Sequence, residues 1–387
     1  MYLFITTSKA KMSDRQLYDP KRIVEHPEFK ILKEKPAKGT GKNIALCYDV
    51  DHVNKFVEKP RLDPSPGQVE VKVRATGICG SDVHFSQHGH IGDMVVRSIC
   101  GCGHESAGEV SRVGEGVTEW KVGDRVAIEA GIPCGQCHFC KIGRYNACEN
   151  DIFFSTPPHF GTMSRYHLHP AAWLHKLPDN VSYEEGALCE PLTVAMAGIY
   201  RSGLRLGDGV LIAGAGPIGL VTLLAAKAAG AIPLITDLSP SRLEFAKKLV
   251  PSVKTILIEK GQTPQEVAER VKKEADMKLT LALECTGVES SIHAAIYSMT
   301  FGGKVFIIGV GKNLQSIPFM HLSANEIDLQ YQYRYANQYP RSIRCVADGM
   351  IDLKPLVTHR FDLEDAMDAF NTAADPKSGA IKVQVHD

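Results

Sequence analysis

The sequence predicts an α/β fold with two domains, an irregular antiparallel β domain followed by a doubly wound parallel sheet. Three observations support this fold class. The chain has 387 residues, more than one hydrophobic core usually serves. Its first half carries short runs in which apolar and polar residues alternate, separated by glycine turns. After about residue 204, apolar strand-like runs alternate with helical stretches, as they do in a parallel sheet.

Composition excludes several classes of partner. Lysine plus arginine and aspartate plus glutamate both number 44, so the formal net charge is +0, which argues against nucleic-acid binding or polybasic membrane attachment. The chain has no apolar run of about 18 residues, and its N-terminus lacks a signal-peptide pattern. We therefore expect a soluble, cytoplasmic protein, with its eleven cysteines present as reduced thiols or metal ligands.

The first half of the chain divides at about residue 42. Residues 1–42 are rich in lysine and proline and end in a glycine-containing stretch, so we expect an N-terminal extension. Residues 43–190 are expected to form the β domain. Its period-two pattern is clearest at 68–74, and further strands are expected at 107–113 and 125–129.

A dinucleotide-binding motif opens the second domain, which we place at residues 191–331. Val210–Ala213 form a short apolar run, Gly214-Ala-Gly-Pro-Ile-Gly219 follows, and residues 220–229 are rich in leucine and alanine. This is the strand, tight turn and helix of a Rossmann fold, in which the glycines permit the turn, the approach of the pyrophosphate and close helix packing. The loop residues expected at the cofactor are Gly214, Gly216, Pro217, Ile218 and Gly219.

The next strand ends at Asp237, about 20 residues beyond the glycines, where a carboxylate accepts hydrogen bonds from the adenosine ribose. A carboxylate there suits a free 2′-hydroxyl and repels a 2′-phosphate, so the sequence favours NAD over NADP. Arg242 is interpreted as packing against adenine or facing solvent. Thr286, Gly309 and Val310 follow later strands and are expected in the cofactor crevice.

Four cysteines form a compact metal-binding pattern, C-x2-C-x2-C-x7-C, at Cys134, Cys137, Cys140 and Cys148. Four thiolates complete a tetrahedral zinc shell with no open position, so this lobe predicts a structural zinc. An iron–sulfur cluster uses similar spacings, but nothing else in the sequence indicates electron transfer, and zinc is favoured over a cluster or free thiols.

A second group of donors suits a catalytic zinc, which needs about three protein ligands and one open position. His104 and Glu105 are adjacent in a glycine-framed loop, although such a pair alone is more often hydrogen-bonded than metal-bound. Cys79, in another glycine-flanked turn, adds a thiolate. Cys100 and Cys102 precede this pair and are interpreted as small buried thiols rather than extra ligands.

These motifs resemble those of the medium-chain zinc-dependent alcohol dehydrogenases, over about residues 43–387. The stretches that carry the resemblance are Gly77–His84, Gly103–Glu105, the four-cysteine lobe and Gly214–Gly219. The polyol branch, in particular the fungal L-arabinitol 4-dehydrogenases and galactitol dehydrogenases, is resembled at Glu190–Leu192, Tyr331–Asn337, Ser202–Asp208, Glu284–Ser291 and Val357–Phe361. The resemblance implies a GroES-like β domain that residues 332–387 return to complete, a Rossmann domain and a homotetramer.

The same resemblance implies ligation of the catalytic zinc by Cys79, His104 and Glu105. It also implies that Glu190 is an acid that holds a water at the metal or reaches the metal itself. The adjacent Cys189 would become a ligand after a register shift of one residue, but the Glu-Pro-Leu sequence favours Glu190. Glu190 through water is the expected proton route, with Ser81 and His84 as an alternative, and Ser81 also matches a substrate-pocket position.

The resemblance also implies further residues that contact the substrate, because they match pocket positions of the family. Phe85 matches a pocket residue, and Phe153 or Phe154 is expected to form an apolar wall. Arg334, with Tyr335, is expected to hold hydroxyl groups because a guanidinium is a rigid fork of donors.

The implied activity is oxidation of a sugar alcohol of the L-arabinitol or galactitol type to a ketose, with hydride transfer to NAD. The alternatives are a sorbitol or xylitol dehydrogenase of broader specificity and a non-catalytic, crystallin-like NAD(P)H-binding relative. Because zinc-free relatives lack the Cys-His-Glu set, the sequence favours an enzyme.

Overall fold

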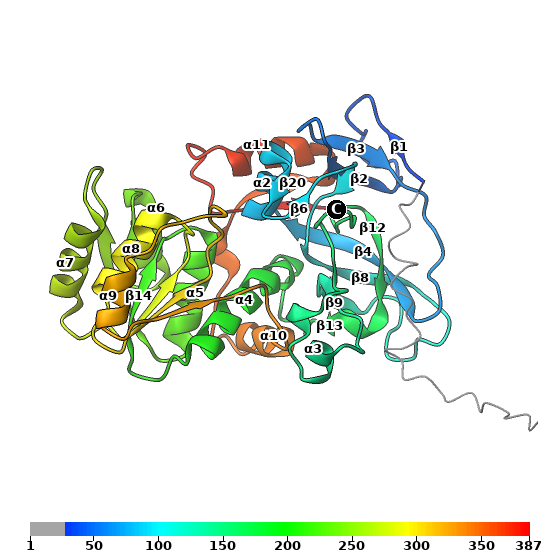
Figure 1. The fold of residues 1–387 in the computed structure, drawn as a ribbon. Coiled ribbons are helices and arrows are strands. Elements are labelled where there is room, and N and C mark those ends of the chain that lie inside the picture. The colour runs from blue at the N-terminus through cyan, green and yellow to red at the C-terminus, as the bar shows by residue number, and fades with distance from the viewer. Residues whose placement is uncertain (1–27) are drawn as a thin grey trace, which may run out of the picture.

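The computed structural model describes residues 28–387, which two large sheets organise into two halves (Figure 1). The first sheet has six strands in the order β16-β15-β14-β17-β18-β19, and every neighbouring pair is parallel. Its strands are β14 (Gly209–Ala213), β15 (Ile232–Asp237), β16 (Lys254–Leu257), β17 (Leu281–Glu284), β18 (Lys304–Ile307) and β19 (Asp328–Tyr331). The helices of this half are α5 (Pro217–Ala228), α6 (Pro240–Leu249), α7 (Pro264–Ala275), α8 (Glu289–Ser298) and α9 (Phe319–Ala324). The chain starts at the centre of the sheet and winds outwards in both directions, so the predicted Rossmann sheet is confirmed.

The second large sheet has seven strands in the order β13-β9-β8-β4-β21-β20, with β12 also paired with β4. Its strands are β4 (Gln68–Gly77), β8 (Glu105–Val113), β9 (Arg125–Ile128), β12 (Tyr166–Pro170), β13 (Leu174–Lys176), β20 (Val357–Asp362) and β21 (Lys382–His386). The pairs are antiparallel except for β20 with β21. The three strands predicted from the sequence correspond to β4, β8 and β9, which confirms the antiparallel β domain.

Smaller sheets surround this half. One has four strands, β1 (Lys30–Ile31), β3 (Lys55–Glu58), β2 (Ile44–Tyr48) and β7 (Cys100–Gly101), and two are pairs, β5 (His90–Ile91) with β6 (Met94–Val95) and β10 (Gly131–Ile132) with β11 (Ile152–Phe153). Because β1 pairs with β3, part of the predicted extension adds an edge strand to the β half. Residues 1–27 of that extension lie outside the described residues. None of the helices in residues 28–387 combines the length and apolar character that a membrane crossing requires.

Helix α4 (Tyr183–Ser202) joins the two halves, since it packs against β8 and β4 on one side and against α5 on the other. The boundary predicted between residues 190 and 191 therefore falls inside a continuous helix. Pro191 removes one helical hydrogen bond, but Leu188, Cys189 and Leu192 around it are fully buried, and their packing stabilises the uninterrupted helix. Helix α10 (Tyr339–Ala347) also packs on α4.

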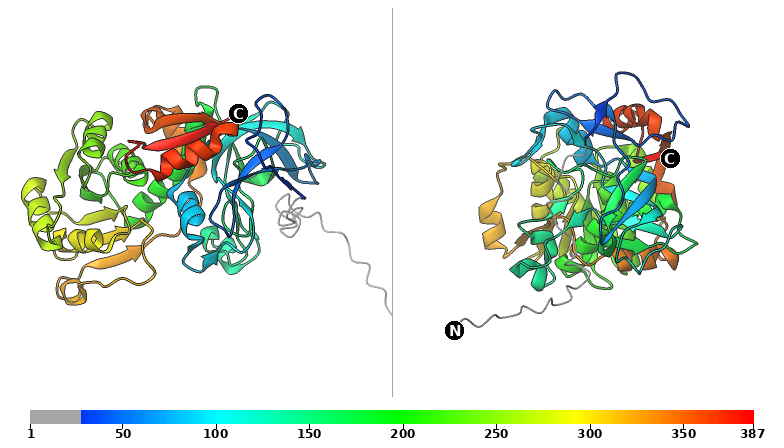
Figure 2. Two further views of the ribbon diagram at one scale, coloured as in Figure 1. Left: turned by 90° about the horizontal axis from the view of Figure 1, so that it is seen from above. Right: turned by 90° about the vertical axis from the view of Figure 1, so that its right-hand side faces the viewer.

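The C-terminal segment returns to the N-terminal half. Strand β21 pairs with β4, and α11 (Ala366–Ala374) packs against β20, β21 and helix α2 (Gly80–His88). Both views in Figure 2 place these red elements among the blue and cyan ones. As a result, the last strand of the chain lies beside the strand that leads into Cys79.

Candidate active site

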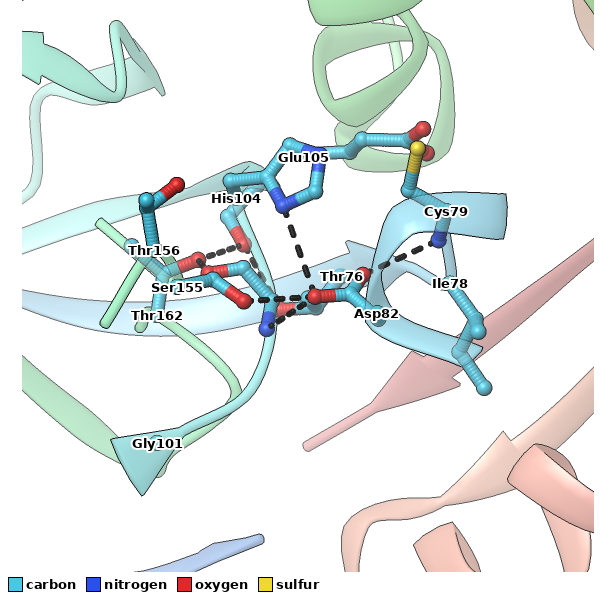
Figure 3. Close-up of polar contacts among 12 residues, drawn as sticks. Thr76, Ile78, Cys79, Asp82, Gly101, His104, Glu105, Ser155, Thr156 and Thr162 are labelled. Carbon is cyan, nitrogen blue, oxygen red and sulfur yellow. Dashed lines mark hydrogen bonds and ion pairs between the residues drawn. The ribbon is translucent and has the colours of Figure 1, made fainter. Parts of the chain in front are cut away.

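Three candidate zinc ligands converge where β4 ends and β8 begins (Figure 3). One donor atom each from Cys79, His104 and Glu105 lies within 4.8 Å of the others. Gly77, the last residue of β4, pairs with Glu105 across the sheet, and a Cβ atom on Gly77 would lie 2.1 Å from Glu105 Oε2. A side chain at residue 77 would therefore displace the Glu105 carboxylate from its position among the ligands.

Asp82 orients two of these ligands, a role that the sequence analysis did not foresee. It is fully buried in the first turn of α2, where Oδ2 accepts a hydrogen bond from the Cys79 backbone N–H at 3.0 Å. Its Oδ1 lies 3.5 Å from His104 Nδ1 and accepts a hydrogen bond from Ser155 Oγ at 2.5 Å. Because Nδ1 faces a carboxylate, His104 Nε2 is the nitrogen left for a metal ion. The signal in the sequence was local, an aspartate three residues after the N-cap cysteine.

Lys382 is a second residue that the sequence analysis missed. Its Nζ lies 2.8 Å from Glu105 Oε1 and 2.7 Å from Oε2, and it donates to the Ile78 carbonyl at 3.2 Å. Both side chains are buried, with 4% and 1% of their surface exposed. Burial lowers the pKa of Lys382, but the charges of Glu105 and Cys79 and the hydrogen bond to Glu105 together outweigh it and raise that pKa above its usual value. The ammonium group therefore balances the carboxylate inside the protein.

The choice between Cys189 and Glu190 depends on which of the two faces the other ligands. Cys189 belongs to the hydrophobic core between α4 and its neighbours, where burial raises the pKa of its thiol. Burial, with the charge of Glu105, raises the pKa of Glu190 to about 7, while His104 acts in the opposite direction. Of the two, only Glu190 has a pKa that is shifted by the charges of His104 and Glu105, and its role at the metal stays a prediction.

The donors fit zinc. A thiolate, an imidazole and a carboxylate form a mixed set that leaves one coordination position open for a substrate atom. Cys100 and Cys102 are fully buried in a hydrophobic cluster with Tyr48 and are in neither of the groups of metal-binding donors in residues 28–387. This geometry agrees with their interpretation as buried thiols.

The four cysteines of the lobe also converge, with one sulfur of each within 4.8 Å of the others. Cys137 is the N-cap of α3 (His138–Lys141), Cys140 lies within this helix, and Cys148 follows the short 3-10 helix η2 (Tyr145–Ala147). Burial raises the pKa of Cys134, but hydrogen bonds from the backbone N–H groups of Gln136 and Cys137, together with those from the thiols of Cys148 and Cys137, outweigh it and lower the pKa to about 7. N–H groups that stabilise a thiolate suit a metal ligand, and four sulfurs with no further donor fit a structural zinc.

Next to the candidate zinc site, aromatic and charged side chains form a wall. The Phe153 ring lies 5.6 Å from the His104 ring, and the Arg334 guanidinium stacks on Phe153 at 3.7 Å from its centroid. Arg334 Nη1 also donates to Asp151 Oδ2 at 2.8 Å, an ion pair that the sequence analysis did not predict. Tyr335 is buried, and its hydroxyl lies close enough to Glu190 that hydrogen bonding between them acts to lower the Glu190 pKa.

The other predicted pocket residues lie in different surroundings. Phe154 packs edge-on against His167 at 4.6 Å, which leaves Phe153 as the wall residue. Phe85 is 3% exposed and stacks on Tyr48 in the core of the β half, so its predicted contact with substrate stays a prediction. Ser81 lies in the first turn of α2, two residues after Cys79.

The predicted cofactor loop has the geometry that a dinucleotide needs. Gly214 has φ +98°, and a Cβ on Gly219 would lie 1.9 Å from the Gly214 carbonyl oxygen. At Gly216, by contrast, the space for a Cβ is open, with only Arg242 Nη1 within 4 Å among the described residues. The loop therefore leaves room for a phosphate beside the start of α5, with a guanidinium at its edge.

The ribose-side acid and the outer loops lie around this opening. The Asp237 carboxylate accepts hydrogen bonds from the N–H groups of Ala215 and Ser239, both at 2.7 Å, which fixes it next to the glycine loop. Thr286 follows β17, and a Cβ on Gly214 would lie 2.5 Å from its Cγ2. Gly309 approaches Gly287 so closely that a Cβ would lie 2.2 Å from the Gly287 nitrogen. Val310 beside it is 68% exposed.

Comparison with known proteins agrees with this fold and site. The alcohol dehydrogenase GroES-like domain model matches residues 65–179, and the zinc-binding dehydrogenase model matches residues 217–348. The chain belongs to the family of medium-chain zinc-dependent dehydrogenases. The predicted family, fold class and assignment to oxidoreductases are thereby confirmed.

Within the family, its relatives include polyol dehydrogenases. An L-arabinitol 4-dehydrogenase of Aspergillus oryzae is 59% identical over 361 residues, which cover 89% of this chain and 94% of the relative. A sorbitol dehydrogenase of Bos taurus is 46% identical over 327 residues, which cover 84% and 91%. Among solved structures, 2R,3R-butanediol dehydrogenase from Bacillus subtilis has a TM-score of 0.79 at 31% identity, covering 89% of this chain and 99% of that chain.

Proposed function

We propose that this chain is a zinc- and NAD-dependent polyol dehydrogenase that oxidises a sugar alcohol of the L-arabinitol or galactitol type to a ketose. The observation that carries the proposal is the convergence of Cys79, His104 and Glu105 beside a half of the chain with a Rossmann sheet. The 59% identity to an L-arabinitol 4-dehydrogenase supports the substrate type. A sorbitol or xylitol dehydrogenase of broader specificity is the second candidate, because sorbitol dehydrogenases of animals are also similar over most of the chain.

Cys79, His104 and Glu105 would hold the catalytic zinc, which supplies a Lewis acid for one substrate hydroxyl. Asp82 fixes the imidazole plane and the backbone of Cys79, so that two ligands keep their positions whether or not substrate is bound. Lys382 reduces the net negative charge of the ligand set, which leaves a bound metal a stronger electrophile.

The proton released from the substrate needs an acceptor near neutral pH. Glu190 suits this role because its pKa is raised to about 7, chiefly by burial, so it can both take up and release a proton. The Tyr335 hydroxyl acts to lower the Glu190 pKa by hydrogen bonding, and the Glu190 charge adds to the effect of burial in raising the Tyr335 pKa. Ser81 and His84 on α2 are the alternative route.

NAD would supply the hydride acceptor. The pyrophosphate would lie in the open space at Gly216, and Asp237 would accept hydrogen bonds from the ribose and repel a 2′-phosphate. Arg242 would lie at the edge of the glycine loop. Thr286, Gly309 and Val310 would line the crevice at the ends of β17 and β18.

An uncharged substrate suits the wall of the pocket. Phe153 offers an apolar face, and Arg334 and Tyr335 offer hydrogen-bond donors for hydroxyl groups. Because Asp151 balances the charge of Arg334, the wall as a whole favours a neutral polyol over a sugar phosphate.

A cytoplasmic homotetramer remains our proposal for the location and assembly. The edge strand β19 supports self-association, since it ends the six-stranded sheet and carries Tyr331 with 59% of its surface exposed. Phe319 and Met320 on α9 are also exposed, at 65% and 70%. Light scattering of the purified protein would test the assembly.

The function is tested by following NADH absorbance with L-arabinitol, galactitol, xylitol and sorbitol, and by measuring zinc per chain. We expect turnover with NAD, two zinc ions per chain, and the highest kcat/KM for L-arabinitol or galactitol. Cys79→Ala should abolish turnover and remove one zinc, whereas the matched Cys102→Ala should retain both. Zinc-loaded protein that produces no NADH with any of the four polyols would overturn the proposal.

A further inference from the structure

The four-cysteine lobe contacts the segment that would hold the polyol. Residues 333–337, here named the grip segment, connect β19 to α10 and contain Arg334 and Tyr335. The lobe supplies three hydrogen bonds to this segment from positions between Cys140 and Cys148. Asn146 Nδ2 donates to the Tyr333 carbonyl at 2.8 Å, the Asn337 N–H donates to Tyr145 Oη at 2.7 Å, and Asn337 Nδ2 donates to the Gly143 carbonyl at 2.8 Å.

The chain just after the lobe adds contacts to the Arg334 side chain. Asp151, three residues beyond Cys148, pairs with Nη1 at 2.8 Å, and Thr156 Oγ1 accepts a hydrogen bond from Nη2 at 3.3 Å. Phe153 stacks on the guanidinium at 3.7 Å. The Tyr333 ring also lies over the guanidinium, 4.7 Å from its carbon to the ring centroid, so the arginine is held by two polar contacts and two rings, and further N–H donors of its fork remain for a ligand.

The backbone of the grip segment needs such support. Arg334 has φ +50° and Asn337 has φ +60°, both in the left-handed region. Asparagine tolerates this region, but a long side chain such as arginine rarely adopts it, so the surrounding structure must offset the cost. Strained backbone of this kind gathers at binding sites, where it fixes the direction of a functional side chain.

We propose that the four-cysteine lobe positions the polyol: through Tyr145 and Asn146 it fixes the grip segment and so determines where Arg334 and Tyr335 meet the substrate hydroxyls. Asn146 and Asn337 are positioning residues in this arrangement. A zinc ion bound by the four thiolates would close residues 140–148 into one loop and hold the three lobe groups in place. The lobe thus contributes to polyol affinity as well as to stability. The inference rests on the proposed function.

The test uses Asn146→Asp and Asn337→Asp, which replace the amide donor by a carboxylate of the same shape facing a carbonyl oxygen. Asn180→Asp is the matched control, because Asn180 Nδ2 makes the same type of bond at 2.7 Å, to the Ala347 carbonyl at the other end of α10. In the full-length zinc-loaded enzyme, the KM for the preferred polyol should rise about three- to tenfold in each test variant, the factor that one neutral hydrogen bond supplies. The kcat, the KM for NAD and the zinc content should stay as in the wild type, and Asn180→Asp should change none of them.

Hydrogen exchange gives a readout that is independent of turnover. Peptides spanning residues 332–338 should exchange faster in both test variants and at the wild-type rate in Asn180→Asp. Asn337→Gly, which keeps the left-handed backbone but loses the side-chain bond, should show the same rise in KM if Asn337→Asp folds poorly.

Unchanged polyol KM and unchanged exchange in the test variants, with an active wild type, would overturn the inference alone. Loss of zinc from the variants would also overturn it, because the effect would then lie at the metal. Absence of polyol turnover in the wild type would instead overturn the proposed function, and the exchange data would still report whether the lobe holds the segment.

Discussion

Replacing Lys382 by methionine should expose how strongly the candidate zinc site depends on one buried ion pair. The substitution leaves the Glu105 carboxylate 1% exposed and without its cationic partner. Removing one member of a buried pair costs about 3–5 kcal/mol, because the remaining charge is neither solvated nor neutralised. At about 2 °C per kcal/mol for a chain of this size, the metal-free variant should unfold about 6 °C or more below the metal-free wild type.

Zinc should reduce this difference. A metal ion bound to Glu105 neutralises the same carboxylate that Lys382 otherwise balances, so the zinc-loaded variant should lose less stability than the metal-free one. Differential scanning calorimetry on zinc-loaded and chelator-treated protein measures both differences. The chelator also removes zinc from the four-cysteine lobe, but it does so in the wild type and in the variant alike. The stability lost at the lobe therefore cancels when the two metal-free proteins are compared.

A matched control is Lys42→Met, which breaks an exposed pair with Glu58 at 3.0 Å and should cost less than about 1 kcal/mol. If metal-free Lys382→Met unfolded at the same temperature as metal-free Lys42→Met, the buried pair of Lys382 with Glu105 would not stabilise the fold more than an exposed pair does. If zinc-loaded and metal-free Lys382→Met lost equal stability, Glu105 would not bind the metal.

Three further predictions concern the remaining residues. Arg334→Ala should lower polyol kcat/KM at least about tenfold, the effect of a charged hydrogen bond, while NADH affinity in fluorescence titration stays constant; unchanged polyol kinetics would remove Arg334 from the site. Asp82→Asn should weaken zinc binding about 10- to 100-fold in chelator competition, because His104 loses its orienting carboxylate; wild-type affinity would refute that role. Burial holds the pKa of His167 and His169 below the ordinary 6.5, so the unfolded chain binds more protons and urea stability should fall as pH drops below 6.5. His169→Gln should flatten this dependence, and a slope equal to that of the wild type would contradict it.

Local sequence patterns predicted the fold well, because a turn or a strand depends mainly on residues that are close together in the sequence. The turn at Gly214–Gly219 lies between β14 and α5, as its glycine spacing predicts. Cys134 to Cys148 lie close enough along the chain that their spacing alone brings the thiolates together. The boundary predicted at residue 190 lies within α4, and no local pattern reports that this helix packs against both halves.

The sequence by itself thus determined the two folds, the four-cysteine lobe, the dinucleotide loop and, with the family resemblance, the Cys79, His104 and Glu105 set. Only the tertiary structure brought Lys382 to Glu105, 277 residues away along the chain, and Asp151 to Arg334, 183 residues away. The physical reason is that these partners meet through the pairing of β21 with β4 and the contact of the lobe with the grip segment. Burial strengthens the electrostatic attraction within each of these two ion pairs, and the extent of burial depends on the whole fold.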